Sequence, residues 1–445
     1  MIYPKHEIHA SSSNVPLLTF AERLSPAIMA DVLARSLREG AVGCSGETFV
    51  FFDLSRLQNL LDRLKAAFPP TTLHAVAVKA NPTVEILRQI CLAGHGCEVA
   101  SIGELELANT VGFPHEAVVF DSPVKTREEL EYALRLGIGI NANSLGELER
   151  IDALYSPSSS RSRIGVRINP ETGKGSINTT SVATHNSKFG VPMKKNRDTL
   201  LRVFSAYKWL TGVHVHIGSQ GMSPEQLLEG VGTVYDFFVE ARQSTEVTVF
   251  NIGGGLPAKY RESEKPIRFA EYADSLRLRC PDLFTPSVSL VTEFGRSLHA
   301  SCGWVASKIE YRVESSDGTP TLLVHVGADM FVRKAYRPDD WHHDISVCDS
   351  KGNLRTGTMR TFRVAGPLCF AGDYLDRSVS LPNDATEGDY VIVHDAGAYT
   401  FSMWSLYNSR QFPPIIGYEG PGTKFRHLRN RQSVEDIVKF WSCVT

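Results

Sequence analysis

The stretch HAVAVKANP, residues 74–82, joins a strand pattern to a lysine and shows the unit from which the fold follows. Its first half is a short apolar run of small and β-branched residues, which suits a strand buried in a sheet. Asn81-Pro82 then signals a turn. A lysine between the two either extends its amine to solvent or keeps a desolvated amine for chemistry. On this stretch alone, the first interpretation of Lys79 is favoured.

Comparable apolar runs recur along the next two hundred residues, with helical patterns such as 54–68, 124–137 and 224–243 between them. Alternating strands and helices predict an α/β protein with a parallel sheet. The runs are 74–80, 96–100, 117–121, 137–143, 163–170, 210–219, 248–255 and 288–295. Eight such units over about 250 residues predict a (β/α)8 TIM-like barrel. An open doubly wound sheet is the alternative, but no G-x-G-x-x-G motif opens a helix after the first strand.

The pattern changes after about residue 300, where short β-rich runs are separated by Gly, Pro, Asp and Asn. This change predicts a second, mostly antiparallel β domain. A chain of 445 residues is also too long for one compact core. We therefore expect an N-terminal segment (1–45) that joins the β domain, a barrel (46–300) and a C-terminal β domain (301–445). The extended-looking stretch 11–20 is the reason for assigning the N-terminal segment to the β domain.

Composition excludes several classes of partner. Lys and Arg total 47 against 49 Asp and Glu, so no basic excess indicates nucleic acid or an anionic membrane. No apolar stretch approaches the roughly 20 residues needed to cross a bilayer, and the first residues do not resemble a signal peptide. The eight cysteines are scattered without CxxC or zinc-ligand spacing. We expect reduced thiols, no bound metal and a cytoplasmic protein.

Three consecutive glycines, Gly253, Gly254 and Gly255, follow the seventh of the eight expected strands. Glycines at a strand end let backbone N–H groups approach an anion, and barrels often bind phosphate at this strand. A flexible turn is an equally good explanation of the glycines by themselves. Together with Lys79, they suggest a phosphorylated aldehyde cofactor held as a Schiff base, pyridoxal 5'-phosphate.

Other strand ends offer the groups that this cofactor requires. His216 is placed to stack on a pyridine ring, and Glu293 to pair with the ring nitrogen so that the ring accepts electrons. Ser219 and the pair Gly295-Arg296 would add donors to the phosphate. Individually, His216 is better explained as a core histidine and Glu293 with Arg296 as a surface ion pair. Compatible groups at several strand ends favour the cofactor site.

A longer set of motifs in this order resembles the fold-type III pyridoxal-phosphate decarboxylases, the family of diaminopimelate, ornithine and biosynthetic arginine decarboxylases. The similarity covers about residues 45–420 and is greatest to the diaminopimelate decarboxylases through HIGSQ, SKFG and YNSR. The motifs are VKANP, SIGELELA, RINP, SKFG, HVHIGSQ, NIGGGLP, EFGRSL, GPLCFAGD and GAYTFSMWSLYNSR. This resemblance implies the barrel and β-domain arrangement of alanine racemase, pyridoxal phosphate as cofactor, and an amino acid decarboxylase.

The resemblance also implies roles for residues beyond the barrel. Lys79 would hold the cofactor aldehyde, and Cys369 of GPLC would donate a proton from the partner subunit of a homodimer that shares its active sites. Asp373 would shape the Cys369 loop and contribute to substrate binding, as would Arg296. Tyr399 would reach the phosphate and the substrate. Arg333 resembles an arginine that binds a substrate carboxylate, although the sequence RKAY around it departs from the family motif.

Two departures from the family bear on the substrate. Phe294 replaces a proline in EFGR, which affects the turn. Phe370 stands where diaminopimelate and ornithine decarboxylases carry an acidic residue that binds the distal ammonium of the substrate, and an aromatic ring cannot accept that hydrogen bond. We therefore expect a substrate that is bulkier, apolar or differently charged, as in specialised metabolism. Trp404 with Phe370 would stack on it, and the long polar loop 171–190 would be a lid.

Other functions compete with this interpretation. Decarboxylation of D- or L-lysine or ornithine is one alternative. An amino acid racemase is another, but the racemases of this fold lack GPLC and use a tyrosine base. A third is a non-catalytic regulator of the same fold, against which the intact Lys79, Glu293 and Cys369 argue.

Overall fold

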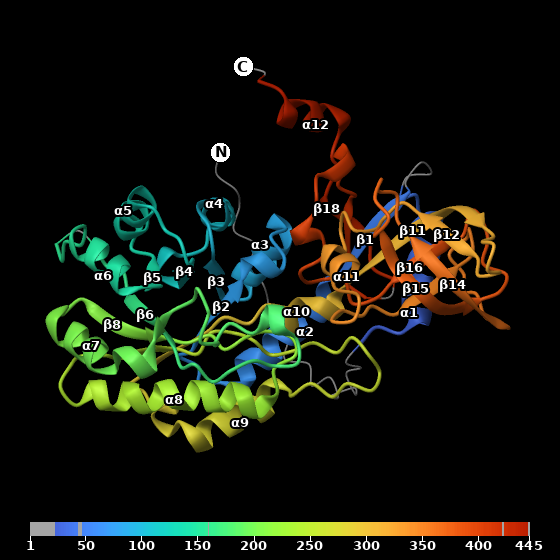
Figure 1. The fold of residues 1–445 in the computed structure, drawn as a ribbon. Coiled ribbons are helices and arrows are strands. Elements are labelled where there is room, and N and C mark those ends of the chain that lie inside the picture. Colours follow the sequence, from blue (N-terminus) through green and yellow to red (C-terminus); the bar gives the residue numbers. More distant parts are fainter. Residues whose placement is uncertain (1–22, 43–46, 159, 421, 444–445) are drawn as a thin grey trace.

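The computed structural model describes residues 23–42, 47–158, 160–420 and 422–443. Two sheets organise these residues, a barrel and a second sheet beside it (Figure 1).

Eight parallel strands close the barrel in the order β5-β4-β3-β2-β10-β9-β8-β6, with β6 pairing back to β5. Each coincides with one of the apolar runs of the sequence, so the predicted (β/α)8 barrel is confirmed. The strands are β2 (Leu73–Ala77), β3 (Gly96–Val99), β4 (Val118–Phe120), β5 (Gly139–Ala142), β6 (Ile164–Asn169), β8 (Leu210–His214), β9 (Val249–Asn251) and β10 (Ser289–Thr292). The two-residue strand β7 (Val191–Pro192) pairs with the end of β6.

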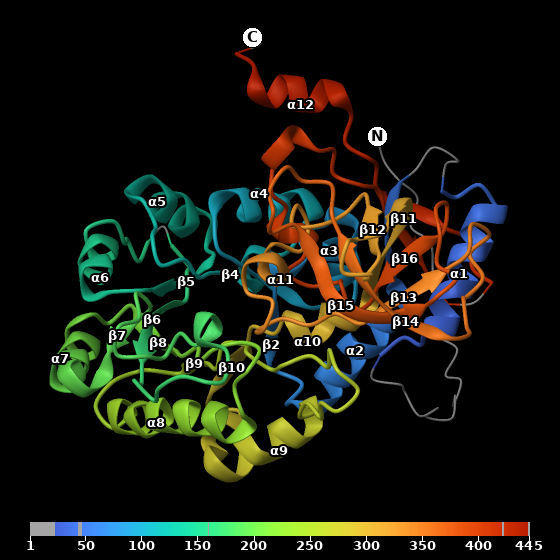
Figure 2. The ribbon, with the colours of Figure 1, turned by 45° about the vertical axis from the view of Figure 1, so that its right-hand side comes forward.

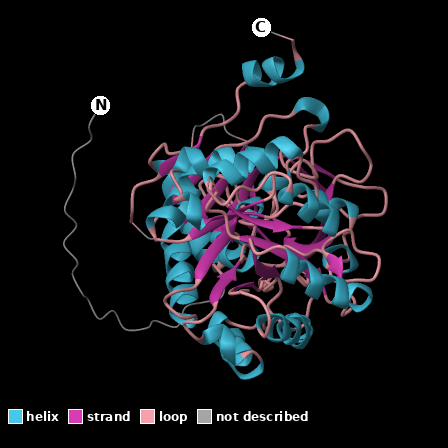
Figure 3. Cartoon of the chain, turned by 90° about the vertical axis from the view of Figure 1, so that its left-hand side faces the viewer, coloured by secondary structure: helices cyan, strands magenta, loops and turns pink. Residues whose placement is uncertain are grey.

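Helices cover the outside of the barrel (Figure 3). Their apolar faces pack against the strands. Helix α5 shows how capping residues set the ends of a helix: it begins with a capping box between Thr126 and Glu129 and ends at Gly137 in the left-handed conformation. The helices are α2 (Leu54–Ala67), α3 (Val84–Leu92), α4 (Ile102–Val111), α5 (Arg127–Leu136), α6 (Leu145–Asp152), α7 (Met193–Ala206), α8 (Pro224–Arg242), α9 (Phe269–Arg279) and the short α10 (Arg296–His299).

The second sheet has the order β15-β14-β12-β11-β1-β17-β18, and β16 links β11 to β13. Its pairings are antiparallel except for β1 with β17 and β12 with β14, which confirms the mostly antiparallel β domain. The strands are β1 (Thr48–Asp53), β11 (Gly303–Val313), β12 (Thr321–Val324), β13 (Ile345–Cys348), β14 (Met359–Ala365), β15 (Tyr374–Pro382), β16 (Tyr390–Val393), β17 (Ile415–Tyr418) and β18 (Arg426–Arg429).

Strand β1 precedes the barrel in sequence but pairs in the second sheet, where Phe51 stacks on Trp304 with ring centroids 4.2 Å apart. Helix α1 (Pro26–Arg38) packs its buried residues in the same cluster as these rings. The barrel's hydrogen bonding therefore begins with β2. The domain boundaries stay a prediction, and the extended stretch 11–20 lies outside the described residues.

Short elements complete the chain. The helix α12 (Val434–Trp441) projects beyond the second sheet near the C-terminus (Figure 2), and α11 (Val332–Tyr336) follows β12. Single 3-10 turns are η1 (Val78–Ala80), η2 (His115–Ala117), η3 (Asn178–Thr180), η4 (Pro281–Phe284), η5 (Ala300–Cys302), η6 (Phe401–Met403) and η7 (Tyr407–Ser409). None of the helices in the described ranges has the length and apolar character to cross a membrane.

Candidate active site

Lys79 lies in η1, directly after β2, and its amine points to a neighbouring strand end. Nζ lies 2.5 Å from Oε1 and 2.6 Å from Oε2 of Glu98, which is fully buried on β3. Burial lowers the pKa of Lys79, but the charge of Glu98, with further contributions from Glu293 and Asp121, outweighs it and raises the pKa overall. The buried pair thus keeps an ammonium at the carboxyl end of the barrel.

The pKa of Glu98 is also raised, compared with that of a free carboxyl group in water. Burial raises its pKa to about 8, and the nearby charges of Glu293 and Asp121 add to this shift while Lys79 opposes it. The carboxyl group of Glu98 is the group in direct contact with the lysine amine and is thereby placed to exchange a proton with it.

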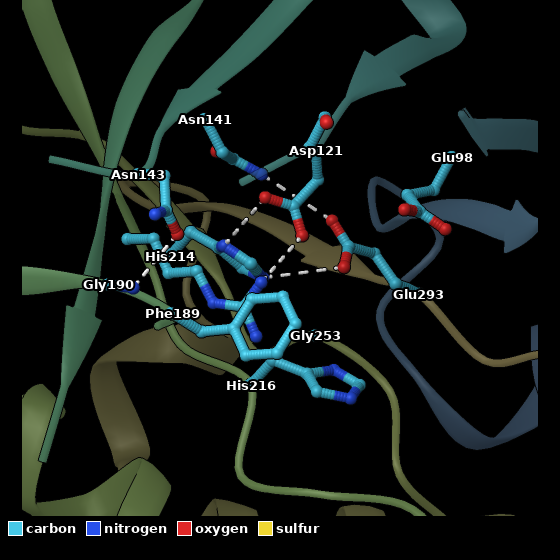
Figure 4. A network of polar contacts seen from close by, with 12 residues as sticks. Glu98, Asp121, Asn141, Asn143, Phe189, Gly190, His214, His216, Gly253 and Glu293 are labelled. Atoms are coloured by element: carbon cyan, nitrogen blue, oxygen red, sulfur yellow. Dashed lines mark hydrogen bonds and ion pairs between the residues drawn. The ribbon is translucent and has the colours of Figure 1, made fainter. Parts of the chain in front are cut away.

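Glu293 follows β10 and is almost fully buried. Its Oε1 accepts a hydrogen bond of 2.6 Å from the Asn251 amide, and the Asn141 amide lies 3.5 Å from the same atom. Its Oε2 lies 3.3 Å from Nε2 of His214 (Figure 4). The predicted surface ion pair between Glu293 and Arg296 is wrong, because both residues are buried and Glu293 points into the barrel.

A second carboxylate stands behind Glu293. Asp121 follows β4, and its Oδ1 lies 3.7 Å from Nδ1 of His214 while its Oδ2 accepts a hydrogen bond of 3.2 Å from Nη1 of Arg167. Burial raises the pKa of Asp121, but His214 and Arg167 outweigh it and lower the pKa overall. Asp121, His214 and Glu293 are also the one group among the described residues with the spacing to hold a metal ion.

His216 offers a flat neutral ring beside this cluster. Its Nδ1 accepts a hydrogen bond of 3.0 Å from the backbone N–H of Gly254. Burial, with the charges of Arg167 and Lys79, lowers the pKa of His216 well below its usual value. The ring is therefore an uncharged imidazole with its proton on Nε2, a suitable partner for stacking on another ring.

The glycine run forms a narrow turn that only glycine fits. Gly253 and Gly255 have φ angles of +64° and +112°, which L side chains rarely adopt. At Gly254 a Cβ atom would lie 2.2 Å from the carbonyl oxygen of Glu293. The turn thus brings backbone close to the end of β10, where Arg296 and Ser219 lie, and leaves space for a ligand at its outer side.

Two arginines approach the same place. Nε of Arg296 donates to Ser219 at 3.3 Å, and its Nη1 donates to the hydroxyl of Tyr260 at 2.8 Å. The guanidinium of Arg333 lies 4.9 Å from the ring centroid of Tyr399 and that of Arg296 lies 4.6 Å from it.

Arg333 belongs to α11 and carries an unmet hydrogen-bond donor. Its Nη1 is buried and has no hydrogen-bond partner, and both guanidiniums contact the ring of Trp341. Burial and the charge of Arg296 lower the pKa of Arg333 to about 10. Two adjacent guanidiniums without a carboxylate partner among the described residues form an anion site.

Tyr399 joins this site to the β domain. Its φ angle is +56°, a conformation that costs energy outside glycine. Its N–H donates to the carbonyl of Ala80 at 3.0 Å, and the Asn81 amide donates to the carbonyl of Gly397. Position 295 also has no room for a side chain, because a Cβ atom at Gly295 would lie 2.9 Å from Cβ of Ala80. The segment after Lys79 is therefore fixed by both domains.

The loop with Cys369 lies in the β domain and is exposed in the single chain. Its N–H donates to Asn408 at 2.8 Å, and Phe370 stacks on Tyr336 with ring centroids 5.8 Å apart. Phe370 also meets the ring of Tyr407 edge-on, so two aromatic rings flank this position. The contacts of Cys369 and Phe370 are with β-domain residues, and Trp404 packs on Phe412 instead of joining them.

Asp373 stabilises that loop from inside. Its two carboxylate oxygens accept hydrogen bonds of 2.6 Å each from the N–H groups of Ala328 and Leu368. Gly327 and Gly366 leave the space it occupies. The expectation that Asp373 shapes the loop agrees with these contacts. A direct contact with substrate does not, because the carboxylate is buried and both of its oxygens are used by backbone.

The loop 171–190 is tied to the barrel end. Asn143 accepts from the N–H of Gly190 at 2.9 Å and donates to the carbonyl of Lys188, and Phe189 lies under the guanidinium of Arg167. Thr180 donates to the carbonyl of Gln220 at 2.6 Å. The loop therefore covers the strand ends, and its movement as a lid stays a prediction.

Several residues of the site did not follow from sequence reasoning. Glu98 lies one residue before the end of β3, Asp121 directly follows β4, and His214 is the last residue of β8, so an acid or histidine near the end of a predicted strand was the available signal. Tyr260 and Trp341 lie in loops, and their positions depend on the fold.

Taken together, these residues fit pyridoxal 5'-phosphate. The glycine turn and Arg296 suit a phosphate, His216 a ring face, and Glu293 a ring nitrogen. The amine of Lys79 suits an aldehyde.

Comparisons with known proteins agree with this fit. Residues 54–300 match the family model described as pyridoxal-dependent decarboxylase, pyridoxal binding domain. The diaminopimelate decarboxylase of Zymomonas mobilis is 28% identical over 397 residues, which cover 86% of this chain and 89% of that protein. A Helicobacter pylori diaminopimelate decarboxylase is 29% identical over 396 residues, with 87% and 94% covered. The Helicobacter pylori enzyme solved with L-lysine has a TM-score of 0.80 at 27% identity and covers 91% of this chain and 98% of its own. A lysine/ornithine decarboxylase from Vibrio vulnificus has a TM-score of 0.71 at 22% identity, with 86% and 97% covered, and shows the shared fold.

Proposed function

The chain belongs to the pyridoxal-dependent decarboxylases, and we propose that it removes the α-carboxylate of an amino acid whose distal end carries an acid and no amine. It is a pyridoxal-phosphate-dependent carboxy-lyase similar to the diaminopimelate decarboxylases. The observation that carries the finer proposal is the unmet donor of Arg333 beside Arg296, together with Phe370 in place of an acid.

Each barrel residue has a distinct task in this proposal. Lys79 would hold the cofactor aldehyde through Nζ in the absence of substrate. Glu98 takes up the proton that leaves Lys79 Nζ and gives it back, as its contact with that atom at 2.5 Å allows. When bound, pyridoxal phosphate supplies an electron sink for the pair left by the departing CO2. Glu293 holds the ring nitrogen, and His216 covers the ring face.

Cys369 is proposed to protonate the substrate carbon after CO2 has left. Its contacts lie in the β domain of its own chain and its thiol is exposed. A donor that is exposed in one chain suits a site completed by a second copy, so we propose a homodimer in which each Cys369 loop serves its partner's barrel.

In each shared active site, Arg333 of the chain that supplies the barrel and Phe370 of the partner subunit would together define the distal specificity. An acid at position 370 would bind an ammonium, whereas the ring of Phe370, stacked on Tyr336, offers an apolar wall. Arg333 lies three residues before Tyr336 on α11 and offers a free donor to a carboxylate. A dicarboxylic amino acid would place a carboxylate at Arg333 and no ammonium at the ring of Phe370. meso-Diaminopimelate would instead bury its second ammonium without a partner.

Substrate profiling tests the proposal. We expect CO2 release to be fastest with 2-aminopimelate or a bulkier amino acid of the same charge, and slower with meso-diaminopimelate, lysine, ornithine and arginine. Phe370→Glu should shift the preference toward meso-diaminopimelate, while Phe370→Leu, which removes the ring without adding charge, should not. Wild-type preference for lysine or meso-diaminopimelate would refute the distal specificity. A product that keeps every carbon atom of the substrate, as a racemase gives, would refute decarboxylation.

A further inference from the structure

The buried cluster behind Glu293 contains more acid than the cofactor site requires. Three carboxylates, of Glu98, Asp121 and Glu293, point into one region of the barrel (Figure 4). The permanent cations among them are Lys79, paired with Glu98, and Arg167, paired with Asp121. Until the ring nitrogen of the cofactor binds, the described residues offer Glu293 only the imidazole of His214 and no permanent cation, although burial of an unpaired charge is costly.

His214 lies where that charge has to be balanced. It is fully buried, with Nε2 3.3 Å from Oε2 of Glu293 and Nδ1 3.7 Å from Oδ1 of Asp121. Among the described residues, neither ring nitrogen nor Asp121 Oδ1 makes a hydrogen bond, so these two carboxylate contacts are the polar neighbours of the ring. The charges of the two carboxylates therefore orient the ring between them.

We propose that Asp121 and His214 are positioning residues for Glu293, in which Asp121 orients the His214 ring and His214 in turn fixes Glu293 Oε2. The other oxygen, Oε1, already accepts a hydrogen bond from the Asn251 amide and is then directed at the ring nitrogen of the cofactor. This inference rests on the proposed role of Glu293 and adds two residues that touch neither substrate nor cofactor.

The arrangement also connects the loop 171–190 to the cofactor. Arg167, the partner of Asp121, lies with its guanidinium 4.6 Å from the ring centroid of Phe189 in that loop. The charged and titratable groups that face or act on His214 are Asp121, Glu293 and His216, and those that act on Asp121 include Arg167, Lys79 and Lys125. Loss of the Asp121 charge removes one of the two carboxylates that orient His214.

The test is an equilibrium titration of the full-length protein, freed of cofactor, with pyridoxal phosphate between pH 6 and 9. Visible absorbance reports both the affinity and the protonation state of the bound cofactor. We expect Asp121→Asn to weaken binding roughly tenfold, the size of one lost charged hydrogen bond.

Two substitutions of His214 separate positioning from packing. The amide of His214→Gln reaches the place of Nε2 and keeps a donor to Glu293, so binding should stay within about threefold of wild type. The amide of His214→Asn ends near Nδ1 and loses that donor, so binding should weaken about as much as in Asp121→Asn. Asp389→Asn is the matched control, since Asp389 is a buried acid paired with Arg355 in the β domain.

The outcomes are distinguishable. Unchanged affinity and spectrum in folded Asp121→Asn, with weak binding in Glu293→Gln, would overturn this inference and leave the proposed function standing. Unchanged affinity in Glu293→Gln would overturn both. A stoichiometric divalent metal that copurifies with the wild type and is lost in Asp121→Asn would also overturn it, because the cluster would then be a metal site.

Discussion

The carboxyl end of the barrel and the Cys369 loop of the β domain serve one proposed reaction, yet they are built in different ways. At the barrel end, charged side chains are held in pairs, the half-buried Lys79 with the buried Glu98 and Arg167 with Asp121, both buried. In the loop, Cys369 is exposed and its neighbours are aromatic rings of the same domain. The barrel end is complete within one chain, whereas the loop presents its reactive group outward. The difference teaches that cofactor binding and proton donation should be separable by mutation.

Lys79→Ala is expected to have the largest effect. Without the amine, the cofactor has no covalent attachment, and decarboxylation should fall by at least roughly 10⁴-fold, as losses of covalent catalysis do. Lys79→Arg is the matched control for charge, since it retains a cation beside Glu98 but cannot bind an aldehyde. Steady-state CO2 release measures the effect. An active Lys79→Ala variant would contradict the assignment of the cofactor site to the carboxyl end of the barrel.

Cys369→Ala is expected to lower decarboxylation by roughly 10²-fold, the range of one general acid, while the affinity for pyridoxal phosphate stays at the wild-type value. Cys443→Ala, the other exposed cysteine of the described residues, should change neither. If Cys369→Ala weakened cofactor binding instead, the two regions would not be separable as described.

Gly254→Ala is expected to do the opposite of Cys369→Ala, because it should weaken the binding of the cofactor. The new Cβ would lie 2.2 Å from the carbonyl oxygen of Glu293, so the turn has to shift. We expect an affinity for pyridoxal phosphate that is weaker by about tenfold or more. Gly146→Ala in α6 is the control, because a Cβ there meets no atom within 4 Å. Equal affinities of the two variants would contradict the assigned role of the turn.

The smallest effect concerns stability and not the reaction. His299 is fully buried without a hydrogen-bond partner, and burial lowers its pKa to about 3. Below the ordinary histidine pKa of about 6.5, His299 therefore binds a proton in the unfolded chain but not in the folded chain. The free energy of unfolding falls as the pH decreases from about 6.5 toward 3. Between pH 7 and 5 this loss is about 2 kcal/mol for one such histidine.

His299→Leu should remove that share of the acid sensitivity and leave decarboxylation unchanged. Urea unfolding at pH 7 and pH 5 measures both proteins. An equal loss of stability in the variant and the wild type would show that His299 is not the source.

Sequence predicted the barrel well because each strand carries its own signal. The apolar run, the turn after it and the residue between them are local, and Lys79, His216, Glu293 and the glycines all stand at such strand ends. The same logic, applied to the last residue of each predicted strand, would have found Asp121 as well, whereas Glu98 lies inside the predicted run 96–100.

The remainder could not be predicted from local patterns. Strand β1 reads like a barrel strand, but its pairing with β11 and β17 depends on residues more than two hundred positions away. Asp373 looked like a binding acid, and only the folded loop shows that Ala328 and Leu368 use both of its oxygens. The pairing of His214 with Asp121 likewise arises from the closure of the barrel.

Reduction of the holoenzyme with borohydride, followed by peptide mass spectrometry, tests the central claim most directly. The account predicts that the cofactor becomes fixed to one peptide, the one that contains Lys79, and that the visible band disappears with it. A reduced cofactor on another lysine, such as the buried Lys125, or on no lysine at all, would contradict the account.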